Sequence, residues 1–405
     1  MSDGPDDPSA STSSFQPLPR VDGSTLTYET FLRDFALPRQ PCIITNLGSE
    51  WEARRWCVDH FLGHDGVDLN HKVYAANGLP KSAKEIKTTV GKALKKVAAA
   101  EASHPYYLSA WNYLRGGSSG LAREFEVPRI FERAPSWLSN HVVLGNAATD
   151  MKWLYIGSQN SGSATHVDTN LSSAWLWVAQ GRKEWVCAHG GDHAILTAGT
   201  GSRAYGYKAD DDDDENEEPS VPLPDFFADD LFERWPQCQG ARLYRGFQEA
   251  GEVCFNPSMC VHAVRNVAEG VTVSLTHNFV DASNLADVLS DAERSIRTEL
   301  LPMATELKPK SVIKTLAKTL GLPKEELAAT LATMPDLLSG NRMEELIECA
   351  AKGAEADGGA EAVASLLRTE LDERLKSVRP AFEKAATALR DALALGVESE
   401  AVAVT

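Results

Sequence analysis

The chain has 405 residues, 43% of them hydrophobic, and nine tryptophans, which is the composition of a globular protein with a large core. This length leaves room for one large domain and a smaller one. The net charge of −17 gives no general attraction to phosphate backbones, so a nucleic-acid reader is disfavoured and a basic protein is the better partner.

The ends and the cysteines bear on location. The first residues, MSDGPDDPSASTSS, have neither a positive nor an apolar segment and predict no signal peptide. No apolar run approaches the ~20 residues that span a bilayer, so no membrane association is expected. Seven cysteines, an odd number without a CxxC pair, indicate reduced thiols. We expect a cytoplasmic protein, with the nucleus as the alternative.

The N-terminal part predicts a mixture of helices and strands. Residues 1–20 are rich in Ser, Pro and Asp and predict a disordered segment. Thr27 is a plausible N-cap for the short helix YETFLRDF, and CIITN reads as a strand. Residues 84–101 alternate basic and apolar side chains at helical spacing, which predicts a helix with a solvated basic face. A further helix is expected within 127–144.

Short strands then follow at roughly ten-residue spacing, which is typical of an antiparallel sandwich or barrel. We expect the strand that holds Lys183 to pair back on the strand before it. The predicted strands cover residues 153–156, 166–168, 174–178, 184–187, 251–256 and 272–279. An acidic run in 208–220 predicts a flexible solvated loop. The catalytic domain is expected to span 21–285.

Residues 286–405 change in character, with Ala, Leu, Glu and Lys in segments separated by Pro and Gly. They predict a helical region, in which Pro380 separates segments 360–376 and 380–395. This region could pack on the β domain, form a homodimer or dock a partner, and the sequence does not choose.

One cluster of residues indicates metal chemistry. His166 and Asp168 stand at i and i+2, so in a strand both point to the same face. Small neighbours leave open space in front of them, and His262 lies in a second strand-like stretch. Two histidines and one carboxylate form the facial triad that holds non-haem Fe(II). Lys183 lies in an apolar strand, where its charge is costly unless it meets an anion.

At these residues the chain resembles a known family. The segments HVD, SAWLWVAQGRKEW, EAGEVCFNPSMCVHAVRN and SLTHNFVDASNLA are similar to those of jumonji-C oxygenases. The resemblance runs from about Thr27 to Glu293. It is greatest to the branch that contains the lysyl hydroxylase of the eukaryotic class-one translation release factor.

The resemblance implies a mainly β fold with α elements. This is the double-stranded β-helix, or cupin jelly roll, with N-terminal α/β elements and a helical C-terminal region. It implies Fe(II), 2-oxoglutarate and O₂ as cofactor and cosubstrates. The turn before the distal histidine usually carries Gly-Trp in this family, and here it is Met259-Cys260.

The site residues follow from the same resemblance. It implies that His166, Asp168 and His262 hold the iron. Lys183, Tyr107 and Ser163 would bind the 5-carboxylate of 2-oxoglutarate, and Thr276 and Asn278 would line the cosubstrate pocket.

The implied activity is hydroxylation of a protein side chain, a lysine, in a basic protein such as a translation release factor. Two alternatives stay open. One is a jumonji-C demethylase or RNA-modifying oxygenase. The other is a catalytically silent barrel that serves as an interaction scaffold.

Overall fold

The computed structural model describes residues 15–80, 82–114, 117–131, 151–200, 222–320, 323–338 and 340–395. The expected acidic loop at 208–220 lies outside these residues, as does most of the helix expected within 127–144. No helix in the described part of the chain is long and apolar enough to cross a bilayer.

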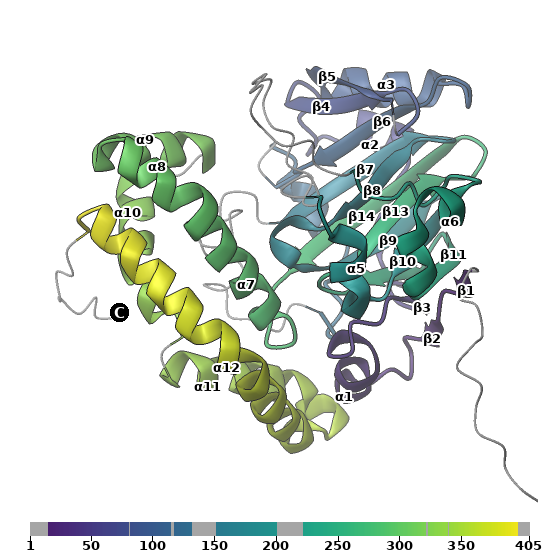
Figure 1. Cartoon of the computed structure of the whole chain (residues 1–405). Helices are drawn as coiled ribbons and strands as arrows, with labels where there is room; N and C mark the ends of the chain where they lie inside the picture. The colour runs from purple at the N-terminus through teal and green to yellow at the C-terminus, as the bar shows by residue number, and fades with distance from the viewer. Residues whose placement is uncertain are drawn as a thin grey trace, which may run out of the picture.

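Two β-sheets form the centre of the molecule (Figure 1). The smaller sheet has five strands, and all neighbours are antiparallel except the parallel pair β1–β11. In order across the sheet they are β1 (Gln16–Pro17), β11 (Leu243–Glu249), β10 (Arg182–Ala188), β13 (Val261–Asn266) and β8 (Gly162–Val167).

The larger sheet has nine strands. Its neighbours are antiparallel except for the parallel pair β2–β3. In order they are β2 (Arg20–Asp22), β3 (Cys42–Thr45), β12 (Val253–Asn256), β9 (Ser173–Gln180), β14 (Val271–Phe279), β7 (Lys152–Ser158), β6 (Tyr106–Trp111), β4 (Lys72–Asn77) and β5 (Lys84–Thr89).

The two sheets pack face to face through an apolar layer to which both contribute, with Leu176 from β9 and Trp185 and Val264 from the smaller sheet. Strand β9 is buried on both faces, because Trp175 and Trp177 point the other way, into the core beneath the helices. This arrangement is the predicted jelly roll, with helices on the outer face of the larger sheet.

The expected pairing of the Lys183 strand with the strand before it is wrong. Strand β9 pairs with β12 and β14, whereas β10 pairs with β11 and β13 in the other sheet. The chain changes sheets at Gly181, whose φ is +88°. A Cβ at Gly181 would lie 2.4 Å from Thr272 Oγ1, so only glycine fits this crossing.

Two other predictions are corrected in the N-terminal part. Residues 16–20 are ordered, because β1 and β2 add to the edges of the two sheets through backbone pairing that composition does not reveal. Within 84–101, the first six residues form strand β5 and only Val90–Ala99 is helical, as α3. Ile86, Thr88 and Thr89 are β-branched, and pairing with β4 decides in favour of a strand.

Short helices surround the sheets, and a helical region follows them (Figure 1). Thr27 caps α1, as predicted, by accepting a hydrogen bond from the Thr30 amide. The α-helices are α1 (Tyr28–Phe31), α2 (Val58–Gly63), α3 (Val90–Ala99), α5 (His193–Thr197), α6 (Leu231–Arg234), α7 (Leu285–Ser295), α8 (Leu301–Glu306), α9 (Pro309–Leu320), α10 (Lys324–Thr333), α11 (Gly340–Ala354) and α12 (Ala360–Ala392).

The described residues also form single turns of other helix types. The 3₁₀ turns are Glu52–Arg55, Ser119–Arg123, Thr169–Leu171, Gly190–Asp192, Pro236–Gly240, Met334–Asp336 and Glu355–Asp357, and the π turns are Leu32–Ala36 and Ile296–Leu300.

Pro380 does not separate two helices, contrary to expectation, because it lies inside the 33-residue helix α12. Buried side chains continue on both sides of it, from Leu371 and Leu375 to Phe382 and Leu389. Packing of this continuous apolar face therefore outweighs the hydrogen bond that a proline removes.

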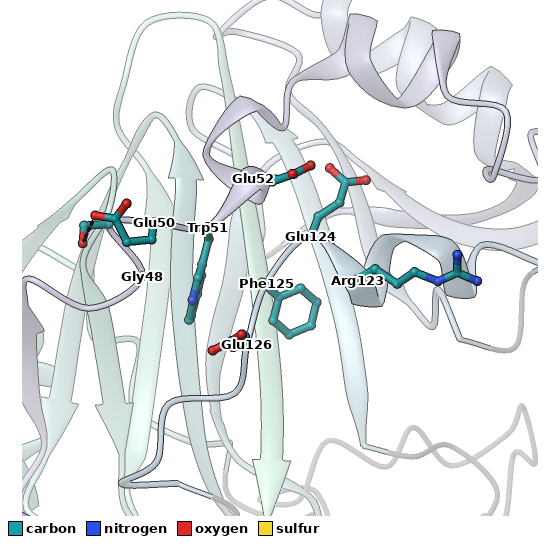
Figure 2. A pocket seen from close by; sticks show the side chains of 9 residues that line it. Gly48, Glu50, Trp51, Glu52, Arg123, Glu124, Phe125 and Glu126 are labelled. Atoms are coloured by element: carbon teal, nitrogen blue, oxygen red, sulfur yellow. Dashed lines mark hydrogen bonds between the residues drawn. The ribbon is translucent and has the colours of Figure 1, made fainter.

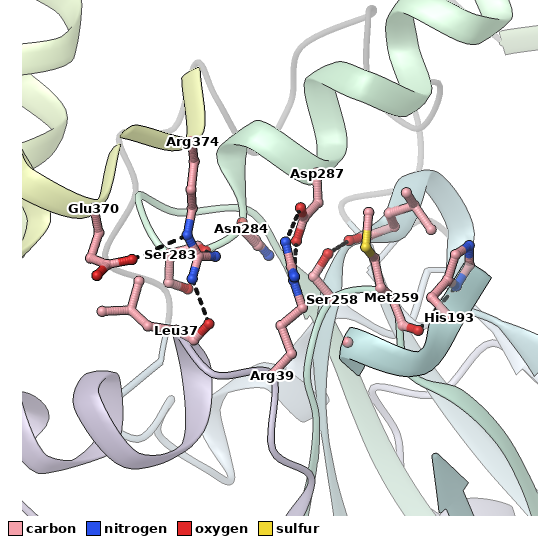
Figure 3. A network of polar contacts seen from close by, with 12 residues as sticks. Leu37, Arg39, His193, Ser258, Met259, Ser283, Asn284, Asp287, Glu370 and Arg374 are labelled. Carbon is pink, nitrogen blue, oxygen red and sulfur yellow. Dashed lines mark hydrogen bonds and ion pairs between the residues drawn. The ribbon is translucent and has the colours of Figure 1, made fainter. Parts of the chain in front are cut away.

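Ion pairs and hydrogen bonds join the helical region to the β domain (Figure 3). Arg374 of α12 donates to the Leu37 carbonyl at 2.6 Å and to the Ser283 carbonyl at 3.3 Å. Arg39 makes a bidentate pair with Asp287 of α7, at 2.8 and 2.6 Å. The Asp287 side chain is only 6% exposed, so this pair is largely shielded from solvent.

We predict that Asp287→Asn lowers the free energy of unfolding by about 2 kcal/mol, because it leaves the Arg39 guanidinium without its shielded carboxylate. Urea unfolding of the purified protein measures this. Glu293→Gln is the matched control, since Glu293 pairs with an Arg297 side chain that is 61% exposed, and it should cost less than about 0.5 kcal/mol. Equal losses in the two variants would contradict the prediction.

Candidate active site

The three predicted metal ligands come together between the two sheets. His166 on β8 pairs in register with His262 on β13, and their ring centroids lie 4.3 Å apart. Asp168 follows β8 in extended conformation, so it projects beside His166 as the sequence predicts. One ligand atom from each of the three residues lies within 4.8 Å of the other two.

Hydrogen bonds orient both imidazoles for metal binding. Nδ1 of His166 lies 2.8 Å from the Ala164 carbonyl, and Nδ1 of His262 lies 3.0 Å from the Cys260 carbonyl. A carbonyl only accepts, so each Nδ1 carries the proton and each Nε2 keeps its lone pair. Two neutral imidazoles and a carboxylate are the donor set that suits Fe(II) with open coordination positions.

The two loops that carry the ligands are tied to each other. Ser258, in the turn before His262, donates through Oγ to the Leu171 carbonyl at 2.5 Å, just after Asp168. Its amide also donates to Ser173 Oγ at 3.0 Å. The relative position of Asp168 and His262 is therefore fixed through Ser258 as well as through the strands.

Met259, in that same turn, has a φ of +63°. This left-handed conformation disfavours any residue with a Cβ and suits the glycine that the jumonji-C resemblance leads us to expect there. His193 holds the turn in place, with Nδ1 lying 3.1 Å from the Met259 carbonyl (Figure 3).

We predict that Met259→Gly is more stable than Met259→Ala by about 1 kcal/mol, because both lose the methionine side chain but only glycine relieves the left-handed strain. Thermal or urea unfolding of the two variants gives this difference directly. A more stable alanine variant would show that the turn is not strained.

The triad lines a cavity between the sheets. The cavity, including its solvent-open mouth, has a volume of about 360 Å³. Besides the triad, three of the five expected cosubstrate residues line it: Tyr107, Ser163 and Thr276. Thr276 Oγ1 is buried and has no hydrogen-bond partner, which leaves it available to a ligand. The other lining residues are Tyr155, His166, Asp168, Ala174, Leu176, Trp185, Asn256, His262 and Val264.

Asn278 does not line this cavity. Its side-chain amide donates to Ser172 Oγ at 3.0 Å, so it supports the loop that follows Asp168. Tyr155, Trp185 and Asn256 line the cavity but were not singled out from the sequence. Strand alternation could have found Tyr155, which stands two residues before Gly157 and stacks on Tyr107.

Lys183 is completely buried and is not itself among the residues that line the cavity, whereas its neighbour Tyr107 is. Its Nζ donates to Asn266 Oδ1 at 3.0 Å and lies 5.8 Å from the centre of the Tyr107 ring. No described carboxylate pairs with it, and burial lowers the pKa of its ammonium group from 10.5 to about 7. An anion entering the cavity would supply the missing charge, so the site fits a carboxylate-bearing ligand.

A chain of polar groups supports Lys183. Asn266 Nδ2 donates to Ser161 Oγ at 2.9 Å, and Ser161 in turn donates to the Ser158 carbonyl at 2.6 Å. Gly157 makes room for this chain, because a Cβ there would lie 2.2 Å from Ser161 Oγ and 2.4 Å from the Tyr107 ring. The orientation of Lys183 is thus fixed before any ligand arrives.

A second cluster could also suggest a metal. His60 and His64, at α2, place Nε2 atoms 3.2 and 3.0 Å from the Glu124 carboxylate. However, the Gly66 amide donates to His64 Nδ1 at 2.9 Å, so the neutral ring carries its proton on Nε2, facing Glu124. Trp56 Nε1 also donates to Glu124, at 3.1 Å. We call these side chains around Glu124 the clasp; Trp56 supplies its hydrogen bond to the carboxylate, whereas His60 Nε2 and Glu124 Oε1 are buried close together without a hydrogen-bond partner.

The clasp borders another hollow, which encloses about 690 Å³ of space between protein atoms. Figure 2 shows Glu124 turned toward one side of its chain segment and Phe125 toward the other. Trp51 lines the hollow and packs on Trp177, with ring centroids 5.0 Å apart, on the outer face of the larger sheet. The hollow therefore lies on the opposite face from the triad.

We predict that the anaerobically loaded protein binds one Fe(II) per chain and that His166→Ala abolishes this binding, because two protein ligands hold iron poorly. Metal analysis after desalting measures the ratio. His64→Ala, which disrupts the clasp, is the control and should keep its iron. If the His64 variant lost its iron and the His166 variant kept it, the metal would be bound by the clasp and not by the triad.

The sequence matches the family model of the cupin-like domain over residues 28–284. The chain therefore belongs to the cupin-like domain family, and the resemblance to jumonji-C oxygenases is confirmed.

Three relatives illustrate the comparison. The bifunctional arginine demethylase and lysyl-hydroxylase psr-1 of Caenorhabditis elegans is 26% identical over 270 residues, which cover 66% of this chain and 62% of the relative. The 2-oxoglutarate and iron-dependent oxygenase JMJD4 of Homo sapiens is 27% identical over 281 residues, or 65% and 61%. The arginine-specific demethylase JMJ22 of Arabidopsis thaliana is 26% identical over 292 residues, or 71% and 51%. The chain thus spans less than two thirds of the length of these relatives.

Proposed function

We propose that the protein is an Fe(II)- and 2-oxoglutarate-dependent oxygenase that hydroxylates a protein side chain. The observation that carries the proposal is the pairing of two features between the same sheets. The His166, Asp168 and His262 triad offers metal ligands, and the buried Lys183 lacks an anion. A catalytically silent scaffold would gain nothing from an uncompensated ammonium group in its core.

Each group has a separate task in this proposal. Iron and 2-oxoglutarate, when bound, supply the oxidising chemistry that inserts an oxygen atom from O₂ into a substrate C–H bond. The triad holds the metal through two imidazole nitrogens and one carboxylate. Lys183 forms a charge-assisted pair with the distal carboxylate of the cosubstrate. Leu176, Trp185 and Val264 line the cavity with apolar surface that limits access of water.

For the substrate we propose a lysine side chain, in a protein such as a translation release factor. The names of two relatives support it: psr-1 is called a lysyl-hydroxylase, and JMJD4 an oxygenase. Demethylation is the second candidate, because psr-1 and JMJ22 are both named as arginine demethylases. Cytoplasmic location and a homodimer through the C-terminal helices stay predictions.

The decisive experiment measures succinate release from 2-oxoglutarate by the iron-loaded protein. It is run with and without a release-factor peptide centred on its lysine motif, and peptide mass is followed in parallel. Stimulation with a gain of one oxygen atom, lost in Asp168→Ala, supports the lysyl hydroxylase. Formaldehyde release from a methylarginine peptide without hydroxylation would favour the demethylase. Absence of turnover with every substrate would overturn the oxygenase.

We predict that 2-oxoglutarate binding takes up a proton above pH 7. The pKa of Lys183 is about 7 in the free site, and a paired carboxylate raises it. Affinity should therefore be greatest below pH 7 and fall as pH rises toward 9, by up to about tenfold per pH unit. Anaerobic titration calorimetry in two buffers of different ionisation enthalpy measures the uptake.

Lys183→Met is the control for this prediction, because it fills the same space without a titrating group. It should bind 2-oxoglutarate weakly and without proton uptake. An affinity that is the same at pH 7 and pH 9 in the unchanged protein would show that Lys183 does not receive the cosubstrate carboxylate.

A further inference from the structure

Positive charge is concentrated at one end of the larger sheet. Between residues 71 and 100 the sequence has seven lysines and one acidic residue, a net charge of +6. Because the whole chain carries −17, the residues outside this segment together carry −23. Six of these lysines are described, and all six are exposed: Lys72, Lys84, Lys87, Lys92, Lys95 and Lys96. We call these six residues the lysine edge. It occupies β4, β5 and α3 (Figure 1).

Part of the lysine edge continues the face of the sheet that lines the active site. Ala76 of β4 pairs with Tyr107 of β6, so their side chains share a face. Lys72 and Tyr74 lie on that same face, and Lys87 of β5 pairs with Tyr74. Strand spacing and rise place Tyr74 within roughly 10 Å of Tyr107. Anything bound over this hairpin is therefore beside the mouth of the cavity.

Strand β5 ends the sheet, and in the part of the chain that the structure describes nothing pairs with its outer side. Its backbone N–H and C=O groups there are a template for another strand. Lys87 projects from one face of this strand and Lys84 from the other. Helix α3 buries Val90, Leu94 and Val97 and leaves its lysines outside, so charge is present on both faces of the edge.

The simplest alternative is that lysines on an edge strand prevent self-association and have no further role. That role does not require Lys72, which lies on the inner strand β4, or the three lysines of α3. Preventing self-association also does not require that acidic residues be almost absent from this segment, yet Glu85 is the one acidic residue between residues 71 and 100. The distribution instead matches an anionic partner that contacts both faces of β5.

We propose that an acidic segment of the protein substrate docks along β5 as an added strand, with its carboxylates on the lysine edge. This rests on the proposed function and departs from the basic partner expected from the net charge, because it names as substrate a protein whose target residue stands next to an acidic extended segment. Strand addition uses the backbone of β5 for affinity and alternate side chains for specificity.

A peptide explains the surface better than RNA does. RNA is held by aromatic rings on which successive bases stack, together with arginine. Residues 71–100 contain no arginine. Tyr74 is 51% exposed, but the Lys87 ammonium lies over its ring at 5.9 Å. The free backbone edge, in contrast, is useful only to another polypeptide.

The test uses fluorescence anisotropy with the full chain and three labelled probes. These are a 12-residue peptide alternating Glu with Val or Thr, a peptide of equal charge with proline at every third position, and a 12-nucleotide oligouridylate. Lys84→Glu with Lys87→Glu removes the proposed contacts on β5. Lys310→Glu with Lys324→Glu is the matched control, because it makes the same change of charge at exposed positions of α9 and α10.

We expect the alternating peptide to bind at least tenfold more weakly to the β5 variant, while the control variant changes its affinity less than twofold. The proline peptide should bind at least fivefold more weakly than the alternating one. Equal loss in both variants, equal binding of the proline peptide, or tighter binding of oligouridylate would each overturn the proposal. Unaltered circular dichroism of the β5 variant excludes misfolding.

Succinate release without substrate separates this proposal from the proposed function. The β5 variant should keep that basal turnover, because none of its changed residues lines the cavity. If the unchanged protein binds the peptide through β5 but never releases succinate, the docking surface stands and the oxygenase fails. If turnover is normal and the peptide does not depend on β5, the oxygenase stands and the docking surface fails.

Discussion

The structure depends on a cation that is buried before it has a counter-ion. Lys183 lies in the interior between two sheets, where an ammonium group is costly, and the protein meets the cost with an amide oxygen and an aromatic ring instead of a carboxylate. The supporting residues come from both sheets, with Asn266 on β13 and Tyr107 on β6. The fold therefore holds an unpaired positive charge at a fixed position between the sheets, and the triad lies between the same two sheets.

The ligand-bearing loops are also connected to the helical region. The Arg39 side chain binds Asp287 on α7, and its carbonyl accepts from the Gly190 amide at 3.0 Å, next to the segment that holds His193. His193 contacts the Met259 carbonyl in the turn before His262. Hydrogen bonds and short stretches of backbone thus connect α7 with the turn that precedes His262. The C-terminal helices are part of the same packed structure as the site, through contacts of α7 and α12.

Local rules recovered the chemistry of the site better than its architecture. Two-residue periodicity places His166 beside Asp168, and the cost of a buried lysine marks Lys183 as a ligand for an anion, so three of the central residues follow from local rules. The change of sheet at Gly181 could not be predicted, because β9 and β10 read like any hairpin and their partners are far away in sequence, 55 residues even for the pair Ala188 and Leu243. The strand β5 and the continuous helix α12 show the same limit, since pairing with β4 and packing around Pro380 override the local pattern.

The order of strands places the metal ligands and the β4–β5 hairpin on different parts of the fold. The triad lies on β8, on β13 and in the loop after β8, all in the smaller sheet or next to it, whereas β4 and β5 are the last two strands of the larger one. Substitutions in the β4–β5 hairpin change no residue that lines the cavity and cross no strand that bears a metal ligand. A change of docking partner through this hairpin would therefore leave the metal ligands and the cavity lining untouched.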